Sequence, residues 1–319
     1  MTPHPTVRAW TLPLRPGARV DGDAWLLRLI EVTGAEPGPT TAFVSGLFGD
    51  KPLGCLTLFE VTQRLAERPL RGSVILAPAV NLPALEAGTR ISPDLLYLNR
   101  RFPGDPDGAV TDQLAYHLLR MLLERTDCIV DLHSGMPTTS LWYTYDFGNP
   151  ALSASFGLPV ILGRQQEGQL SLAATRAGAQ SMLVEFGGAA LGATAPGVRG
   201  CLDVLRFRGQ LPDLREGPDS VPLIRDVRIY SPPVGGFLRS AYDTRDVGST
   251  VGPGTIAWVA GAATGETIDR FEIDREALLL LVNIDPLPVR PGHLASMVGI
   301  PEREPYRVED AAPRAPGGH

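Results

Sequence analysis

The sequence predicts an α/β fold with a largely parallel sheet flanked by helices, followed by a small all-β domain. Three features of the 319 residues support this prediction. Apolar strand-like runs alternate with amphipathic helices over the first two thirds of the chain, and this alternation indicates a parallel sheet. Pro, Gly, Asp and Glu become frequent around residues 211–222. Short apolar runs separated by Gly and Pro turns then follow, which is typical of β structure.

The first part of the chain contains five predicted buried strands and two predicted helices. The strands cover residues 39–48, 72–80, 128–132, 159–162 and 181–186, and the helices cover residues 53–67 and 111–125. Leu58, Val61 and Leu65 recur at helical spacing in the first helix.

The strands of the small β domain are predicted at residues 226–230, 236–238, 255–259 and 278–283. We therefore expect an α/β domain over residues 1–218, which carries the functional site, and a small β domain over residues 219–302. Residues 303–319 form a tail rich in Pro, Ala, Gly and charge, and we expect it to be poorly ordered.

Composition excludes several classes of function. The formal net charge is −6 and no basic block is present, which argues against nucleic acid as a partner. No apolar run reaches the roughly 18 residues that span a membrane, and residues 1–19 do not resemble a signal peptide, so we expect a cytoplasmic protein. The sequence does not determine whether the protein forms oligomers.

The three cysteines lie far apart and lack Cys-x-x-Cys spacing, so we expect core thiols rather than disulfides or a zinc ribbon.

Four polar clusters follow predicted strands, where α/β sheets bind their ligands. Taken alone, a histidine or glutamate at such a place is more often structural, and an arginine cluster is more often plain charged surface. The occurrence of all four clusters at one edge of the sheet indicates a site. The clusters cover residues 45–51, 81–104, 131–135 and 184–188.

The order of these clusters resembles the succinylglutamate desuccinylase/aspartoacylase family, which is similar in fold to zinc carboxypeptidases. Members carry a Gly-x-His-Gly-(Asp/Asn)-Glu turn, then Asp-Leu-Asn-Arg-x-Phe-Pro-Gly, then Asp-Leu-His, and then a late strand that ends in Glu. The counterpart at residues 98–104 is the most distinctive block, and residues 226–292 also resemble the family's later domain. The resemblance implies a zinc-carboxypeptidase-like mixed, largely parallel sheet with a small C-terminal all-β domain.

The resemblance also implies roles for individual residues. Glu185 matches the general base and acid. Arg90 matches the residue that stabilises the oxyanion. Asn99 and Arg100 match the pair that grips the substrate carboxylate, for which a planar guanidinium is well suited. His133 matches the third zinc ligand.

Two zinc ligands of the family pattern are replaced. Phe48 stands at the position of the first His, and Lys51 stands at the position of the ligating Glu. A phenyl ring cannot bind a metal, and an ammonium repels it by about 4 kcal/mol per unit charge at ~4 Å. We therefore predict that zinc is absent or bound in a non-standard way, and that no other cofactor is used. A substitute ligand set of Asp50 with His133 is the alternative.

Lys51 can be interpreted as drift in a decayed site or as a functional replacement. It is the only lysine among 29 basic residues, which favours a specific role because Lys, unlike Arg, is compact and has a tunable pKa. The anion-binding residues are retained, and Arg101 adds a charge where the family residue is usually uncharged. We therefore assign Glu185, Lys51, Arg90 and His133 to catalysis, and Asn99, Arg100 and Arg101 to substrate binding.

The sequence supports three hypotheses for function. The first is an enzyme that acts on a small carboxylate-bearing acyl or amino-acid-like substrate without zinc, by hydrolytic or non-hydrolytic acyl chemistry. The second is a catalytically inactive family member that binds a small carboxylate or a partner protein. The third is an amide hydrolase with an unusual metal site. Trp142, Tyr143 and Tyr145 are candidates for the wall of the pocket.

Overall fold

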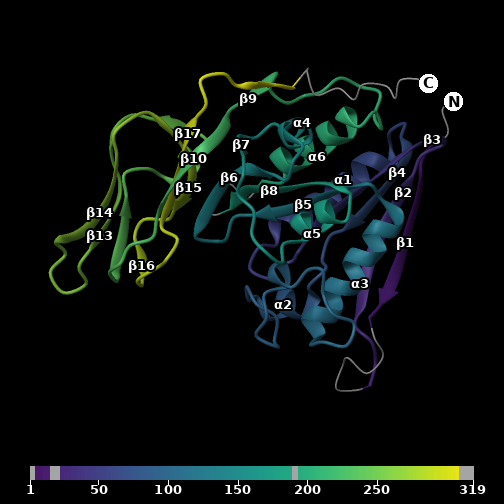
Figure 1. The fold of residues 1–319 in the computed structure, drawn as a ribbon, viewed down its shortest axis with the longest axis horizontal. Helices are drawn as coiled ribbons and strands as arrows, with labels where there is room; N and C mark the ends of the chain where they lie inside the picture. Colours follow the sequence, from purple (N-terminus) through teal and green to yellow (C-terminus); the bar gives the residue numbers. More distant parts are fainter. Residues whose placement is uncertain (1–3, 15–21, 189–192, 309–319) are drawn as a thin grey trace.

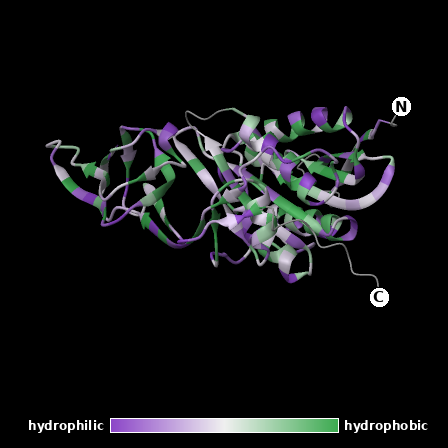
Figure 2. Cartoon of the chain, turned by 90° about the horizontal axis from the view of Figure 1, so that it is seen from above, coloured by the Kyte–Doolittle hydropathy of each residue, from purple (hydrophilic) through white to green (hydrophobic). Residues whose placement is uncertain are grey.

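The computed structural model describes residues 4–14, 22–188 and 193–308. A large twisted sheet with helices on both faces forms the body of the molecule, and a smaller sheet projects from one end (Figure 1). Apolar residues are concentrated on the central strands of the body (Figure 2). No helix among the described residues is long and apolar enough to cross a membrane.

The main sheet joins strands from almost the whole length of the chain. Its order is β1 (Thr6–Pro13), β2 (Leu26–Thr33), β4 (Arg71–Ala77), β3 (Glu36–Ser45), β5 (Cys128–Ser134), β8 (Gln180–Gly188), β6 (Thr139–Asp146), β7 (Val160–Ile161), β10 (Leu223–Tyr230), β17 (Ser296–Pro301), β15 (Ala277–Asn283) and β12 (Thr250–Val251). Strand β6 also pairs with β15, so the pairings run from β6 through β7, β10, β17 and β15 back to β6.

The expectation of a largely parallel sheet is wrong. Strands β4, β3, β5 and β8 are parallel, but β2 is antiparallel to both β1 and β4, and β6 is antiparallel to β8. The pairs among β10, β17, β15 and β12 are also antiparallel. Parallel neighbours need a crossover of a dozen or more residues, usually a helix. Such helices connect only the central strands, because the only helix in residues 208–308 is the three-residue η2 (Thr244–Asp246).

Helices cover both faces of the central strands. Helices α1 (Leu53–Ala66), α4 (Pro150–Ser155) and α6 (Ala195–Phe207) pack on one face, and α3 (Val110–Arg125) and α5 (Leu170–Arg176) pack on the other. Two short helical segments, α2 (Leu82–Ala87) and η1 (Leu98–Arg100), lie between β4 and α3. The predicted helices at 53–67 and 111–125 are therefore confirmed, and the helical spacing of Leu58, Val61 and Leu65 places all three in the core.

The C-terminal strands both extend the main sheet and build a second one. The second sheet has the order β14 (Thr267–Ile273), β13 (Gly254–Ala260), β11 (Gly236–Ser240) and β16 (Leu287–Val289), and β18 (Tyr306–Arg307) pairs with β9 (Ser220–Val221). An additional C-terminal β sheet is thus present. The domain division at residue 218 stays a prediction, and most of the expected tail, residues 309–319, lies outside the described residues.

Candidate active site

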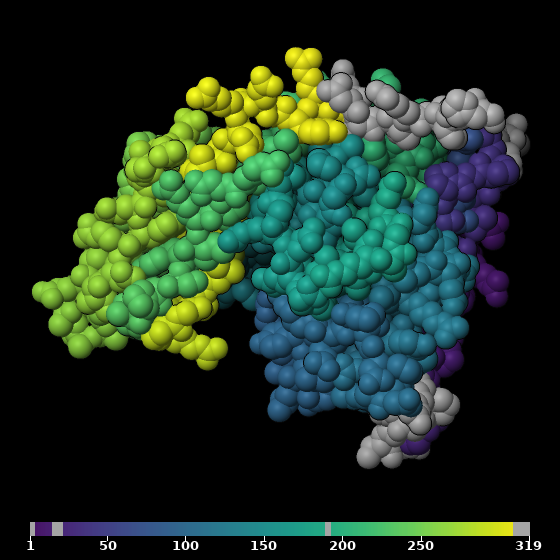
Figure 3. Space-filling model, viewed as in Figure 1, coloured from purple at the N-terminus to yellow at the C-terminus, as the bar shows by residue number. Residues whose placement is uncertain are grey.

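A cavity of about 480 Å³ lies where the parallel strands end, between the α/β body and the C-terminal strands. Figure 3 shows a hollow between these two parts of the molecule. This volume is typical of small-molecule sites. The lining is Phe48, Arg90, Asn99, Arg100, His133, Tyr143, Tyr145, Gly163, Arg164, Gln165, Gln166, Gln169, Leu183, Glu185, Ile229 and Leu294.

A buried ion pair lies at the base of this cavity, and its Glu185 side chain is part of the lining. His133 on β5 and Glu185 on β8 are register partners on neighbouring parallel strands, so their side chains emerge together. Lys51, in the turn between β3 and α1, places its Nζ 3.0 Å from Oε1 and 2.9 Å from Oε2 of Glu185. The Lys51 side chain is 4% exposed and that of Glu185 is 13% exposed, so solvent screens this pair little.

Phe48 lies among the cations of the site. Its ring centroid is 5.3 Å from that of His133, 4.5 Å from Cζ of Arg90 and 5.6 Å from Nζ of Lys51. A guanidinium or ammonium near an aromatic face is attracted by the ring quadrupole. Phe48, Lys51 and His133, the three residues that we compared with zinc ligands from the sequence, are therefore neighbours in space.

His133 is held by two buried polar residues. Its Nε2 lies 2.9 Å from Oδ1 of Asp131, which is fully buried, and 3.2 Å from Nδ2 of Asn99. The Asn99 amide also donates to Asp131, and its Oδ1 accepts from the backbone N–H of Leu170 at 2.8 Å. Asn99 is thus fixed at the join between η1, β5 and α5.

Two of the predicted arginines line the cavity. Arg90 is partly exposed, and its Nη1 lies 3.7 Å from Oδ2 of Asp50. Arg100 donates to its neighbour's carbonyl, Asn99 O, and to Gln166 Oε1. Burial lowers the pKa of Arg100 from its usual value, and the nearby charge of Arg90 lowers it further. Two guanidinium groups of like charge side by side favour an anionic ligand between them.

The structure does not bring Arg101 to this group. Its Nε donates to Oδ1 of Asp112 at 2.5 Å, so the side chain faces α3, and Arg101 is not among the cavity-lining residues. Lys51 also lies beneath the cavity surface rather than on it, and it reaches the cavity through Glu185.

Several lining residues were not singled out from the sequence. Arg164 and Gln166 come from a polar loop that follows β7, and such a loop after a strand is the signal that could have pointed to them. Tyr143 and Tyr145 do line the cavity, and burial raises the pKa of both phenols. Trp142 points to a separate pocket beside Val247.

The donor atoms of the site do not fit a zinc ion. No group of three or more His, Cys, Asp or Glu side chains among the described residues is arranged to hold a metal. Lys51 occupies both oxygens of Glu185 with its ammonium. Asp50, the expected substitute ligand, has Arg90 as its neighbour.

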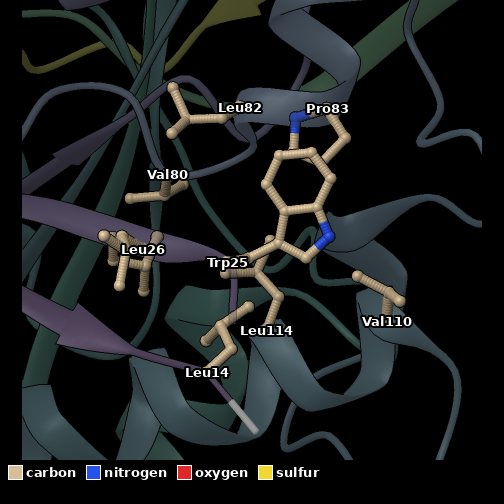
Figure 4. Close-up of a pocket in the computed structure, with 9 residues that line it drawn as sticks. Leu14, Trp25, Leu26, Val80, Leu82, Pro83, Val110 and Leu114 are labelled. Carbon is tan, nitrogen blue, oxygen red and sulfur yellow. The ribbon is translucent and has the colours of Figure 1, made fainter. Parts of the chain in front are cut away.

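A small pocket elsewhere in the body offers no comparable chemistry. It measures about 10 Å³ and is lined only by Leu14, Trp25, Leu26, Leu27, Val80, Leu82, Pro83, Val110 and Leu114 (Figure 4). These side chains carry no ionisable group, so chemistry on a charged small molecule belongs to the larger cavity.

Comparison with known proteins identifies the family. A model of the succinylglutamate desuccinylase/aspartoacylase catalytic domain matches residues 37–197, which is half of the chain. These residues include both sides of the Lys51–Glu185 pair and the Asn99–Arg100 segment. The chain therefore belongs to the succinylglutamate desuccinylase/aspartoacylase family.

Solved structures and one curated protein are similar to this chain. A succinylglutamate desuccinylase from Silicibacter sp. TM1040 is 26% identical with a TM-score of 0.79, covering 95% of this chain and 99% of that one. The product-bound ectoine utilization protein EutE (DoeB) from Ruegeria pomeroyi is 25% identical with a TM-score of 0.79, covering 94% and 99%.

The curated relative matches over a shorter stretch. The N-alpha-acetyl-L-2,4-diaminobutyric acid deacetylase of Halomonas elongata is 41% identical over 124 residues, which are 38% of this chain and 36% of that protein. The match therefore spans little more than a third of the deacetylase.

Proposed function

We propose that this protein acts on a small N-acylated amino acid, which it holds by the carboxylate, and that it works without zinc. The observation that carries the proposal is the Lys51–Glu185 pair on the floor of an arginine-lined cavity. An ammonium stands where the family pattern has a zinc ligand. The attraction that would hold a dication there is thereby replaced by repulsion of roughly 8 kcal/mol at ~4 Å and an effective dielectric near 20.

The anion-binding part of the cavity supports the substrate class. Arg90, Arg100 and Arg164 all line it, and the Asn99 amide lies beside Arg100. Guanidinium groups bind carboxylates through paired N–H donors. The deacetylase and desuccinylase relatives are named for acylated amino acids, which carry both a carboxylate and a scissile amide.

Amide hydrolysis can be assigned to these residues as follows. Glu185 accepts a proton from water as the water oxygen attacks the acyl carbon, while one of its two bonds to Lys51 lengthens. Arg90 stabilises the negative charge that forms on the carbonyl oxygen. Glu185 then passes the proton to the amide nitrogen, the C–N bond breaks, and a carboxylic acid and an amine leave. Lys51 acts through Glu185 and is a positioning residue.

One observation favours a second candidate. Both oxygens of Glu185 are engaged by Lys51, so one of these two contacts must lengthen before the carboxylate can accept a proton from water. A protein that binds the same acylated amino acid without turnover would keep the arginines and the Asn99 amide. Acyl transfer to an acceptor other than water is a third outcome of the same site.

The zinc content of the purified protein distinguishes these zinc-free candidates from a metal hydrolase. Purified protein incubated with zinc should retain none after dialysis. The double variant Phe48→His/Lys51→Glu restores the family's ligand types beside His133 and should bind stoichiometric zinc, as elemental analysis will measure. Stoichiometric zinc in the unaltered protein that is lost in His133→Ala would overturn the proposal.

Turnover of N-acetyl and N-succinyl amino acids distinguishes the enzyme from the binding protein. We expect Arg100→Ala to weaken ligand binding by about 10- to 100-fold, the range for a lost charge-assisted contact. Arg101→Ala is the matched control on the same segment and should leave binding unchanged, because its partner is Asp112. Glu185→Gln should abolish turnover while retaining binding. Binding without turnover in the unaltered protein would favour the second candidate.

A further inference from the structure

The cavity has two chemically different sides. The α/β body contributes its charged groups, Arg90, Arg100, Arg164 and Glu185. Strand β10 and the loop before β17 contribute one lining side chain each, and both are aliphatic: Ile229 and Leu294. A ligand whose carboxylate is held by Arg90 and Arg100 therefore has an apolar surface available within the same cavity.

Ile229 and Leu294 are placed together by strand pairing. Ile229 lies on β10, next to Tyr230, whose carbonyl accepts a hydrogen bond from the N–H of Ala295 at 2.8 Å. This bond draws Leu294 beside the end of β10. Ile229 is 42% exposed and Leu294 is 45% exposed, although both lie at a cavity. Exposed aliphatic side chains that converge at a cavity are typical of a ligand-binding surface.

Three further lining residues are large and hydrophobic. Phe48, Tyr143 and Leu183 line the same cavity, and all three side chains are buried. A volume of about 480 Å³ leaves room for a ligand larger than an acetylated amino acid. The side chains of Ile229 and Leu294 offer no hydrogen-bond donor to a second anionic end, so contact with them favours an apolar end.

We propose that Ile229 and Leu294 select substrates that carry an apolar chain at the end remote from the bound carboxylate. This inference rests on the proposed function and adds to it the chemical class of the second group. This apolar chain of the substrate is either its acyl group or its amino-acid side chain, because both present the same methylene groups to Ile229 and Leu294.

Binding of a homologous series tests the proposal. Dissociation constants are measured by calorimetry for the N-acetyl, N-butanoyl and N-hexanoyl derivatives of L-aspartate, and for N-acetyl derivatives of L-alanine, L-norvaline and L-2-aminooctanoate. The aspartate derivatives and the N-acetyl derivatives are the two arms of this test. In one of the two arms, each added methylene should lower the dissociation constant about threefold, which is somewhat less than the factor expected for a fully buried methylene. N-butanoyl-aspartate should bind more tightly than N-succinyl-aspartate, which has the same chain length but a charged end.

Serine variants link the effect to the two residues. Ile229→Ser/Leu294→Ser should flatten the dependence on chain length and leave the affinity for the two shortest ligands, N-acetyl-aspartate and N-acetyl-alanine, unchanged, which also shows that the variant is folded. Ile268→Ser is the matched control, because Ile268 is 47% exposed on β14 and does not line the cavity. It should keep the full dependence.

Three results would overturn the inference: a flat series in both arms, tighter binding of the N-succinyl than of the N-butanoyl compound, or an unchanged slope in the double variant. In each of these cases the N-acetyl compounds still bind, and the proposed function stands. Failure of every acylated amino acid to bind would overturn both.

Discussion

At the scale of single residues, the site depends on which charges are paired. Lys51 and Glu185 neutralise one another below the cavity, whereas Arg90 and Arg100 face it with their guanidinium groups. A buried pair of this kind is costly to break, because removal of one partner leaves the other charge in a poorly solvated place. The stability of the protein is thus coupled to the same pair that we propose for function.

Removal of Lys51 alone should destabilise the protein strongly. We expect Lys51→Met to lower the free energy of unfolding by about 3–5 kcal/mol, since it leaves the Glu185 carboxylate unpaired. The double variant Lys51→Met/Glu185→Met should recover most of this loss. Urea denaturation measures both. Arg120→Met, which breaks a pair that is 63% and 60% exposed, serves as the control and should change stability by less than about 1 kcal/mol.

At the scale of elements, the turn that carries Phe48 and Lys51 is fixed by the close approach of α1 to the sheet. Gly54 lies in the first turn of α1 and is buried. A Cβ at this position would lie 2.2 Å from Oγ of Ser45 on β3 and 2.9 Å from the carbonyl oxygen of Leu132 on β5. Glycine therefore lets the start of the helix contact two parallel strands directly.

Alanine at position 54 should be destabilising despite its better helix propensity. Overpacking costs about 1–3 kcal/mol, and the gain over glycine in a helix returns at most about 1 kcal/mol. We expect Gly54→Ala to lower the free energy of unfolding by about 1–2 kcal/mol in urea titrations. Gln63→Ala, at an exposed position of the same helix, should be near neutral; an equal effect of both substitutions would contradict the close-approach argument.

The elements recovered from the sequence are those with a strong apolar pattern. Helices α1 and α3 and the central strands carry this pattern, whereas β6 begins with Thr139 and Ser140, whose polarity hides a largely buried strand. Helix α6 contains Pro196, Gly197 and Gly200, three residues that disfavour a helix when only the sequence is considered. The two glycines are required because a Cβ there would meet the rings of Phe186 and Phe156, a packing constraint that a single sequence does not reveal.

The sequence predicted only those parts of the candidate site that depend on local patterns. Strand ends predicted that His133, Glu185 and Lys51 would gather, and they do. The sequence could not predict the direction of the Arg101 side chain. Arg100 and Arg101 are neighbours at the end of a 3-10 turn, and the local backbone geometry points their side chains in different directions. The contribution of Ile229 and Leu294 depends on how the C-terminal strands join β6 and β7, which no local pattern encodes.

At the scale of the whole molecule, separate apolar clusters pack against the two faces of the main sheet. Cys55, Cys128 and Cys201 are all buried free thiols. Burial raises the pKa of Cys55 and of Cys128 from 9.0 to about 11, and it raises the pKa of Cys201 further. The folded state thus retains these protons at a pH where the unfolded chain has lost them.

This difference predicts a loss of stability in alkali. Between pH 9 and about 11 the unfolded state binds fewer protons, so the free energy of unfolding should fall as the pH rises through this range. Urea midpoints at pH 8, 9 and 10 will measure the slope of stability against pH, and Cys55→Ala/Cys128→Ala should reduce this slope.

Thiol labelling checks the burial of the cysteines directly. At pH 8 a thiol reagent should label no cysteine in the native protein and all three in urea; rapid labelling of the native protein would contradict the burial of the thiols.

The burial of Lys51 has a practical consequence for spectroscopy. Because the chain has a single lysine, selective nitrogen-15 labelling of lysine yields one side-chain resonance, and its assignment needs no further experiment. The ammonium is enclosed by Glu185 and Phe48, so its hydrogens should exchange slowly enough to be observed. The protein therefore contains an intrinsic reporter at the base of its cavity, whose signal will register the arrival of a ligand without any attached label.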